Sequence, residues 1–338
     1  MHEPWGRENP QANAIPDRVS GVCGHMVCSL AVLNDSGSSS RMAEATNKTT
    51  TWSDVIGLAA GYLERHEVPD PHIAAELLAA RLLRSSRGFL ASHMQKTVPE
   101  AHLEAMRRGM MRLVKGEPVQ YVLGEWDFRT LTLKCDRRAL IPRPETEELV
   151  ERVLKHLRAN YGPSGKAPFV VDVGTGSGCI ILSLAKEFGH GVFLGTDISA
   201  EAISLARENA ELCDLKDAVS LVVSDGLDEF DPESVDVIVS NPPYITSADC
   251  ESLDPRVKDF EPRSALDGGV SGLDFYERFI GDAMNVLKPG GALFFEIGEG
   301  QGEALREMFE SYGFRDVLIE RDFAGHDRYA SGRLCQLA

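Results

Sequence analysis

The sequence has no pattern of cysteine or histidine that is typical of a disulfide framework or a metal site. Its 7 cysteines are odd in number and scattered, and none stands in a Cys-x-x-Cys pair. The 9 histidines include no His-Glu-x-x-His arrangement. Cys23 and Cys28 lie near each other, but no second pair is present to complete a zinc site. We therefore expect reduced thiols in a cytosol-like compartment and no bound metal.

The chain also lacks an excess of positive charge and a long apolar run. Only 35 Lys and Arg stand against 52 Asp and Glu, so the formal net charge is -17. This overall field repels a phosphate backbone, which makes duplex nucleic acid a poor candidate partner. The longest apolar run near the start, residues 26–33, is too short to cross a bilayer, and we expect no membrane association.

The composition of the chain is typical of a globular protein, with 43% hydrophobic and 26% charged residues, but the first 49 residues differ from the rest. Residues 1–49 are rich in Ser, Asn, Gly and Pro and predict a disordered extension, within which Met42 is an alternative start. The early Glu3 and Glu8 argue against a secretory signal. We expect a cytoplasmic protein, with an organelle matrix as the alternative if the extension is a transit peptide.

Residues 50–118 have the periodicity of helices. Apolar side chains recur at helical spacing over 52–67, Asp70 followed by Pro71 predicts the start of a second helix, and 99–114 predict a third. The segment has no cluster of His, Cys or paired carboxylates, so we predict a helical substrate-binding domain without chemistry of its own. Residues 119–142 then change to the alternation of strands, which predicts a β-hairpin linker.

Residues 143–338 predict the catalytic domain, because apolar strands alternate with helices. Such alternation is typical of a mostly parallel sheet that helices cover on both faces. The predicted fold class is therefore α/β, with a Rossmann-like sheet and a small N-terminal helical domain joined by a β-hairpin. The expected strands are 169–173, 192–196, 219–223, 235–239, 292–297 and 317–321, with 332–338 as a candidate for a last one.

A glycine-rich turn, VVDVGTGSGCI, joins the first of these strands to its helix. Gly174, Gly176 and Gly178 allow a sharp turn and a close approach of the backbone to a ligand, while the helix N-terminus offers free N–H groups. The dinucleotide pattern G-x-G-x-x-G is not met, because a cysteine stands in place of its last glycine. Asp197 ends the second strand about 20 residues on, where a ribose is held. A tight turn without a ligand is the alternative, but together these residues favour a nucleoside site.

Two further strand ends bring polar residues to the same edge of the sheet. Asp225 is placed to reach an adenine amino group, and a turn-forming Asp before Gly226 is the alternative. In SNPPY, Asn241 presents a side-chain carbonyl, Pro242 a backbone carbonyl without a competing N–H, and Tyr244 a flat ring. This loop suits a planar NH2 group, which has two protons to donate. A rigid connecting turn is the alternative.

Taken together, these segments resemble a known family. DVGTGSG followed by NPPY is similar to the amino-group methyltransferases that use S-adenosylmethionine, and GEPVQYVLGEWDF, LIPRPETEELV and FEPRSALDGG resemble the PrmC/HemK family of protein-(glutamine-N5) methyltransferases. The similarity covers residues 51–338. It implies a methyltransferase fold and transfer of a methyl group from S-adenosyl-L-methionine to the GGQ-motif glutamine of class I peptide chain release factors.

The resemblance also implies the roles of individual residues. Asn241, Pro242 and Tyr244 are expected to be catalytic, and with Pro243 they would hold the glutamine side chain. No residue is assigned to a metal. The expected cofactor-binding residues, with Asp225 added from its position, are Gly174, Thr175, Gly176, Ser177, Gly178, Asp197, Asp225, Gly226 and Asn241.

Other functions could use the same loop. The N6 group of adenine is also a planar NH2, so a nucleic-acid adenine-N6 methyltransferase is an alternative, although the net charge of -17 and a plain helical domain argue against it. A ribosomal-protein glutamine methyltransferase is an alternative closer to the proposed activity, because its catalytic loop would have a similar sequence. A non-catalytic binding module has less support because NPPY is intact. We expect a monomer that acts on release factors and does not contact nucleic acid directly.

Overall fold

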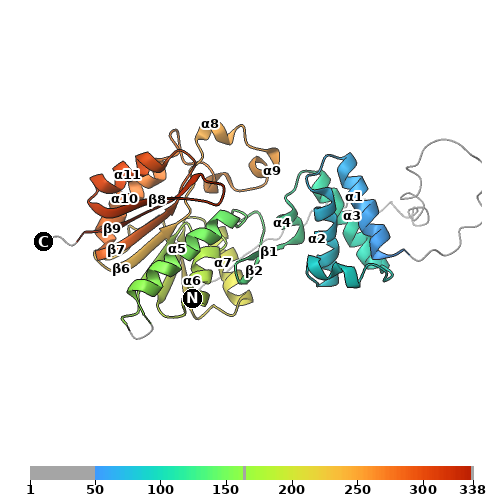
Figure 1. Ribbon diagram of the computed structural model, residues 1–338, viewed down its shortest axis with the longest axis horizontal. Coiled ribbons are helices and arrows are strands. Elements are labelled where there is room, and N and C mark those ends of the chain that lie inside the picture. Colours follow the sequence, from blue (N-terminus) through green and yellow to red (C-terminus); the bar gives the residue numbers. More distant parts are fainter. Residues whose placement is uncertain (1–49, 163–164, 336–338) are drawn as a thin grey trace, which may run out of the picture. The chain divides into compact units, whose positions relative to one another are not determined.

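The computed structural model describes residues 50–162 and 165–335 (Figure 1). The predicted extension over 1–49, with Cys23, Cys28 and Met42, lies outside these ranges. From Thr51 onward the described residues form one compact unit. Within the described ranges, no helix is both long and apolar enough to span a membrane, and no three His, Cys, Asp or Glu side chains gather as a possible metal site.

The N-terminal region is helical, as its periodicity predicted. Thr51 and Asp54 form a capping box at the start of its first helix, in which the Asp54 N–H donates to the Thr51 hydroxyl at 3.3 Å. A Cβ on Gly109 would lie 2.7 Å from Leu78, so glycine allows the second and third helices to pack closely. The apolar faces form a separate hydrophobic cluster. The elements are α1 (Trp52–Arg65), α2 (Pro71–Leu83), the 3-10 turn η1 (Arg87–Ser92) and α3 (Glu100–Val114).

The connector differs from the prediction at its start. We expected strands from residue 119, whereas Val119–Leu123 is a short helix, α4. Pro118 precedes this helix and Gly124 ends it in the left-handed conformation, at φ 75°, so one helical turn fits between them. The predicted hairpin follows as β1 (Glu125–Phe128) and β2 (Leu131–Lys134), which pair antiparallel.

The described residues contain a seven-stranded sheet (Figure 1). Its order is β5-β4-β3-β6-β7-β9-β8, and β9 runs antiparallel to both of its neighbours. The other pairs are parallel, so the predicted mostly parallel sheet is confirmed. The strands are β3 (Phe169–Val173), β4 (Val192–Asp197), β5 (Val219–Val223), β6 (Val235–Ser240), β7 (Leu287–Glu296), β8 (Phe314–Arg321) and β9 (Asp327–Leu334).

Helices cover both faces of this sheet, as Figure 1 shows. Successive side chains of a strand point to opposite faces of the sheet and so belong to different hydrophobic cores. Val170 of β3 lies in one core and Val171 in the other. The helices of the first face are α5 (Pro144–Asn160), α6 (Cys179–Phe188) and α7 (Ala200–Leu212). The second face carries α10 (Asp274–Val286) and α11 (Gly302–Ser311). Three short elements that were not predicted lie between β6 and α10: α8 (Ser247–Cys250), α9 (Pro255–Lys258) and η2 (Arg263–Ala265).

Two strands begin five residues before their predicted start, and β8 begins at Phe314, three residues before its predicted start. β7 begins at Leu287 instead of Ala292, because Leu287 pairs with Val235 of β6 before a bulge shifts the register. The last strand, predicted within 332–338, spans residues 327–334, because it forms a long hairpin with β8 and also pairs with β7. None of these differences changes the class of the fold.

The strand order creates a reversal at the centre of the sheet. The chain moves outward from β3 to β4 and β5, and β6 then lies on the opposite side of β3. In open parallel sheets, ligands bind beyond the carboxyl ends of the strands at such a reversal. The loops that follow β3 and β6 therefore meet at the expected ligand site.

Candidate active site

A cavity of about 390 Å³ lies at this reversal. Its wall contains the glycine loop after β3, the end of β4 and the first part of the NPPY loop after β6. Gly178, Pro242 and Tyr244 are not among the lining residues, and their ligand contacts stay predictions. The predicted site residues that do line the cavity are Gly174, Thr175, Gly176, Ser177, Asp197, Asp225, Gly226, Asn241 and Pro243.

The loop glycines adopt left-handed backbone conformations that other residues rarely occupy. The φ angles are 71° at Gly174, 56° at Gly176 and 83° at Gly178. A Cβ on Gly174 would meet no atom within 4 Å, so space is open beside the cavity at this position. A Cβ on Gly178 would instead lie 3.0 Å from Leu182 of α6. Gly178 thus forms the turn into α6, while Gly174 and Gly176 form the cavity wall.

Asp197 connects the end of β4 to the glycine loop. Its Oδ2 accepts from the Gly176 N–H at 2.9 Å, and its Oδ1 accepts from the Ser199 N–H at 2.9 Å. Burial raises the pKa of Asp197, and these two backbone donors act in the opposite direction. Each carboxylate oxygen has a further acceptor site. Asp197 can therefore hold the loop and still accept from a hydroxyl in the cavity.

Asp172 lies beneath the glycine loop and was not predicted as a site residue. It is fully buried in β3, and the Thr175 hydroxyl donates to its Oδ2 at 2.6 Å. Burial, with a smaller contribution from the nearby Asp197, raises the pKa of Asp172 to about 7, although the Thr175 hydrogen bond acts in the opposite direction. The signal in the sequence was an acid within the apolar stretch VVDV, since a buried strand admits a carboxyl group only beside a polar partner.

Asp225 and Gly226 form another side of the cavity. Arg278 Nη1 donates to Asp225 Oδ1 at 2.9 Å, so the carboxylate also belongs to an ion pair. A Cβ on Gly226 would lie 2.8 Å from the Phe279 ring, and only glycine lets the loop pass α10 at this distance. Phe279 stacks on Phe275 with 3.7 Å between ring centroids, and both line the cavity. These rings were not predicted, because their only signal in the sequence is their place in an amphipathic helix.

Hydrogen bonds from Gln301 hold the NPPY loop in place. Gln301 Nε2 donates to the carbonyl oxygens of Tyr244 and Gly272, each at 3.1 Å. Gly272 has φ 73°, and a Cβ there would lie 2.5 Å from the Tyr244 oxygen. The loop is therefore held by a close backbone contact as well as by its two prolines.

Asn241 begins a buried chain of hydrogen bonds. Its Nδ2 donates to Thr146 Oγ1 at 3.0 Å, and Thr146 Oγ1 donates to Glu296 Oε2 at 2.7 Å. The Tyr244 hydroxyl donates to Glu296 Oε1 at 3.3 Å. Thr146 is 2% exposed and Glu296 is 1% exposed. Asn241 and Tyr244 are predicted from the sequence, whereas Thr146 and Glu296 are not.

Arg143 lines the cavity and is held by another buried acid. Its guanidinium pairs with Glu261, which is 4% exposed and also accepts from the Ile141 N–H at 3.0 Å. Ile141 and Arg143 line a second cavity of about 430 Å³ as well. The segments LIPRPETEELV and FEPRSALDGG, which carried part of the family resemblance, thus contact each other at the site.

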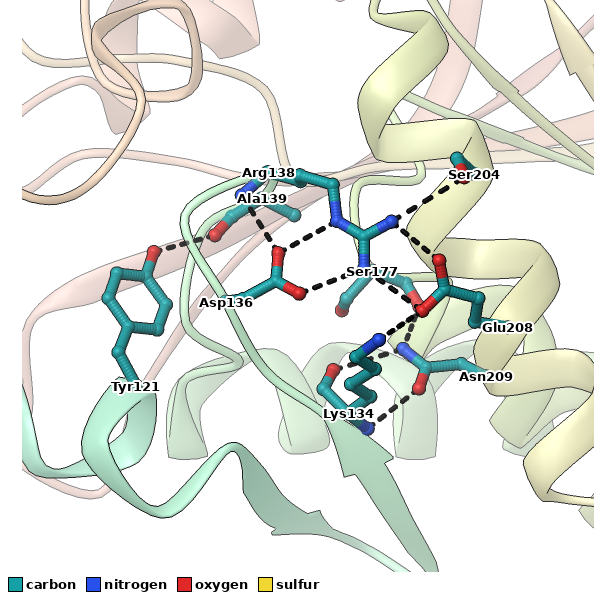
Figure 2. A network of polar contacts seen from close by, with 9 residues as sticks. All are labelled: Tyr121, Lys134, Asp136, Arg138, Ala139, Ser177, Ser204, Glu208 and Asn209. Atoms are coloured by element: carbon teal, nitrogen blue, oxygen red, sulfur yellow. Dashed lines mark hydrogen bonds and ion pairs between the residues drawn. The ribbon is translucent and has the colours of Figure 1, made fainter. Parts of the chain in front are cut away.

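Figure 2 shows how the connector is held against the glycine loop. Asn209 on α7 accepts from the Lys134 N–H at 2.7 Å, and its Nδ2 donates to the Ser177 carbonyl at 2.9 Å. Arg138 pairs with Glu208 on the same helix. Because Ser177 belongs to the glycine loop and Arg138 lines the cavity, this network ties the segment around β2 to the site.

Two family models match this chain. The PrmC N-terminal domain matches residues 54–124, which cover α1 from its third residue onward, α2, α3 and the turn of α4. The Methyltransferase small domain matches residues 150–253, which contain the glycine loop, Asp197 and the NPPY loop.

Relatives match most of the chain. The Release factor glutamine methyltransferase of Geobacter sulfurreducens is 38% identical over 86% of this chain and 99% of its own length. That of Koribacter versatilis is 35% identical over 84% of this chain and 98% of its own. The chain belongs to the release factor glutamine methyltransferase family. The family expected from the sequence is thereby confirmed.

A solved structure also has a fold similar to that of this chain. The hMettl16 catalytic domain in complex with MAT2A 3'UTR hairpin 6 aligns with a TM-score of 0.50 and 18% identity, over 70% of this chain and 84% of that chain. At this identity the likeness concerns the fold alone. The predicted Rossmann-like methyltransferase sheet with an N-terminal helical region is confirmed.

Proposed function

We propose that this chain transfers the methyl group of S-adenosyl-L-methionine to the side-chain amide nitrogen, N5, of a glutamine in peptide chain release factors, and so modulates translation termination. Membership of the family supports the reaction, and the names of the relatives support the substrate. One observation carries the proposal: Asn241 lies at the wall of the glycine-loop cavity with an amide N–H committed to Thr146. Its carbonyl oxygen is then available to an amide that enters.

The residues around the cavity fit S-adenosyl-L-methionine. Asp197 retains acceptor sites for ribose hydroxyls, and Gly174 leaves open space for a close approach. Ile198 is 66% exposed although it lines the cavity, and with Phe279 it offers apolar surface to a base. Asp225 can accept from an adenine amino group. When bound, the cofactor supplies an electrophilic methyl group on a sulfonium sulfur.

The NPPY loop suits the amide of a glutamine side chain. Asn241 Oδ1 can accept one N–H, and the Pro242 carbonyl, whose residue has no N–H of its own, can accept the other. Pro243 adds a rigid wall. Because the Tyr244 hydroxyl is bound to Glu296, Tyr244 would offer its ring and not its hydroxyl to the substrate.

Positioning is the main effect that these residues can supply. An amide nitrogen is a weak nucleophile, because its lone pair is delocalised into the carbonyl. General-base help is typically worth about 10²- to 10⁴-fold, whereas orienting two bound reactants can supply ~7 to 11 kcal/mol. Two acceptors that hold both amide hydrogens turn the nitrogen lone pair toward the methyl group. Neither acceptor needs to take the proton before transfer.

The family's substrate also bears on the compartment, the oligomeric state and the substrate-binding domain of this chain. Release factors act on ribosomes, so we place the chain in the cytoplasm, with an organelle matrix as the alternative. We propose that it acts as a monomer and that residues 50–118 form the domain that grips the protein substrate.

Methyl transfer from labelled S-adenosyl-L-methionine tests the proposal. The full chain is incubated in parallel with a class I release factor, a ribosomal protein and an oligonucleotide. We expect label in the release factor, located on a glutamine by peptide mass spectrometry. Label in the ribosomal protein or the oligonucleotide alone would replace the proposed substrate, and label in none of the three would overturn the proposed reaction.

Asn241→Ala separates catalysis from cofactor binding. It removes one of the two acceptors, and we expect turnover to fall about 10²-fold because the substrate amide loses its orientation. Cofactor affinity, measured by calorimetry, should largely survive. Asn285→Ala is the matched control, since Asn285 is exposed and its side-chain amide donates to the Gly281 carbonyl within α10. Unchanged methylation by Asn241→Ala would remove Asn241 from the mechanism.

A further inference from the structure

The hydrogen-bond chain from Asn241 to Glu296 joins three distant segments at one point. Thr146 belongs to the first turn of α5, Asn241 follows β6, and Glu296 is the last residue of β7. The Thr146 and Glu296 side chains are both almost fully buried. Burial of a carboxylate is unfavourable unless donors surround it. Packing alone therefore does not explain why a carboxyl group, that of Glu296, lies at this position.

The direction of each hydrogen bond follows from a count of protons. An ionised carboxylate has no proton to donate, so Glu296 accepts from Thr146 at 2.7 Å and from Tyr244 at 3.3 Å. The Thr146 hydroxyl has one proton, and once this proton is donated, the oxygen can only accept. Asn241 must then turn its NH2 group toward Thr146, at 3.0 Å. Its carbonyl oxygen is left to face the cavity that Asn241 lines.

We propose that Thr146 and Glu296 are positioning residues, which hold the Asn241 side chain with its oxygen toward the substrate amide. This inference rests on the proposed function. The two ends of a carboxamide are nearly equal in shape, so packing alone does not fix which end faces the cavity. The opposite orientation would set the NH2 of Asn241 against the NH2 of glutamine, two donors facing each other. Thr146 and Glu296 thereby select a donor group as the substrate.

Protonation of Glu296 would reverse this chain. The carboxyl group would donate to Thr146, the Thr146 proton would turn to Asn241 Oδ1, and the Asn241 NH2 would face the cavity. Burial raises the pKa of Glu296 to about 7, while the Thr146 hydroxyl and Arg328 lower it. The titratable groups that face Glu296 are Arg328 and Tyr329 on β9, Glu145 on α5, Tyr244 after β6, Tyr276 on α10 and Cys179 on α6. We therefore expect turnover to rise as the pH increases through about 7.

Variants of Thr146 test the hydroxyl itself. Thr146→Val keeps the shape and removes both the donor and the acceptor, so turnover on a release factor should fall about 10²-fold while cofactor affinity stays unchanged. Thr146→Ser keeps the hydroxyl and should restore most of the turnover. Ser183→Ala, which removes another buried hydroxyl that bonds within α6, is the control and should have no effect. Equal turnover in Thr146→Val and wild type would overturn the inference.

A second variant tests the charge. Glu296→Gln keeps the shape but cannot ionise, so the rise of turnover through about pH 7 should disappear. A purely structural role would lower turnover equally at every pH. A Glu296→Gln profile that still rises as in the wild type would contradict the proposed role of Glu296.

The orientation can also be measured without activity. In protein labelled with ¹⁵N-asparagine, the side-chain NH2 signal of Asn241 is assigned by its loss in Asn241→Ala. We expect this signal to titrate near the pKa of Glu296 in wild type, to shift in Thr146→Val, and not to titrate in Glu296→Gln. These signals decide the inference even if the wild type methylates no release factor, an outcome that would overturn the proposed function alone. A signal that is the same in wild type and Thr146→Val at every pH would exclude the hydrogen-bond chain.

Discussion

Asp172, Glu261 and Glu296 are buried almost completely, and each is bonded to a residue that lines the cavity. Carboxylates in such places need donors that satisfy their oxygens. Because each donor is itself a cavity residue, the acid fixes the rotamer of a side chain that a ligand would touch. The three pairs are Thr175 with Asp172, Arg143 with Glu261, and Thr146 with Glu296.

Glu296 should also make folding stability depend on pH. Its pKa is raised from an ordinary 4.5 to about 7, so in this window the folded state keeps a proton that the unfolded state has lost. The contribution of Glu296 to stability is therefore largest at low pH and is lost as the pH rises toward 7. Across this pH range the free energy of unfolding should change by ~3 kcal/mol.

Denaturant unfolding of Glu296→Gln and wild type at several pH values measures this contribution. The variant should gain stability relative to wild type between about pH 5 and pH 8. Asp172, whose pKa is also raised to about 7, is present in both proteins and cancels in the difference. A difference that does not change with pH would show that Glu296 does not titrate in this range.

Asp197→Ala should weaken cofactor binding. The variant removes the acceptor proposed for the ribose and also frees the Gly176 N–H, so the affinity for S-adenosyl-L-methionine should fall by roughly 1.5 to 3 kcal/mol. Titration calorimetry measures the change, and Asp217→Ala, at an exposed position, is the control. An unaltered affinity would count against the ribose role.

The strands and long helices of the sheet could be predicted because their apolar periodicity is local. The glycine loop and the NPPY loop could also be predicted, since each is a contiguous stretch of sequence. The helices α4, α8 and α9 have 5, 4 and 4 residues, too few to show a helical period. The contact of Thr146 with Glu296 spans 150 residues and depends on the packing of α5 beside β7, which no local pattern encodes.

The link between α7, β2 and the glycine loop can be tested through Asn209. Asn209→Ala leaves the Lys134 N–H and the Ser177 carbonyl without their partner (Figure 2). An unsatisfied buried polar group costs about 1 to 3 kcal/mol, so the free energy of unfolding should fall by roughly that amount. Cofactor affinity should fall as well, because Ser177 lines the cavity.

Asn160→Ala is the matched control for Asn209→Ala. Asn160 is exposed at the end of α5 and donates to the His156 carbonyl, so its loss should be nearly neutral. Unfolding curves that coincide for Asn209→Ala and Asn160→Ala would show that the connector is held by other contacts.

The second cavity indicates how a protein substrate could be held. Its wall combines residues of α2 and α3 with Trp126 and Arg143, and Arg143 also lines the first cavity. Ile73 of α2 is 38% exposed and belongs to this wall. A surface of this kind beside the site is consistent with the substrate-gripping role that we propose for the helical region.

Ile73→Glu should therefore impair capture of the protein substrate and leave the chemistry intact. A charge in an apolar contact should raise the KM for a release factor about tenfold, which corresponds to about 1.4 kcal/mol. The kcat and the cofactor affinity should not change. Leu58→Glu, at a position on α1 that is 46% exposed and outside the cavity, is the control. Equal KM values for the two variants would place the docking surface elsewhere.

The last strand of the sheet has a consequence for how the protein is made. β9 inserts between β7 and β8, sets Tyr329 opposite Glu296 and brings Arg328 beside the same carboxyl group. Synthesis that has not yet reached β9 leaves β7 and β8 unpaired on the sides where this strand lies, and the wall behind the NPPY loop stays incomplete. The site is therefore assembled only once residues 327–334 have been made and have inserted between two strands that precede them in the chain.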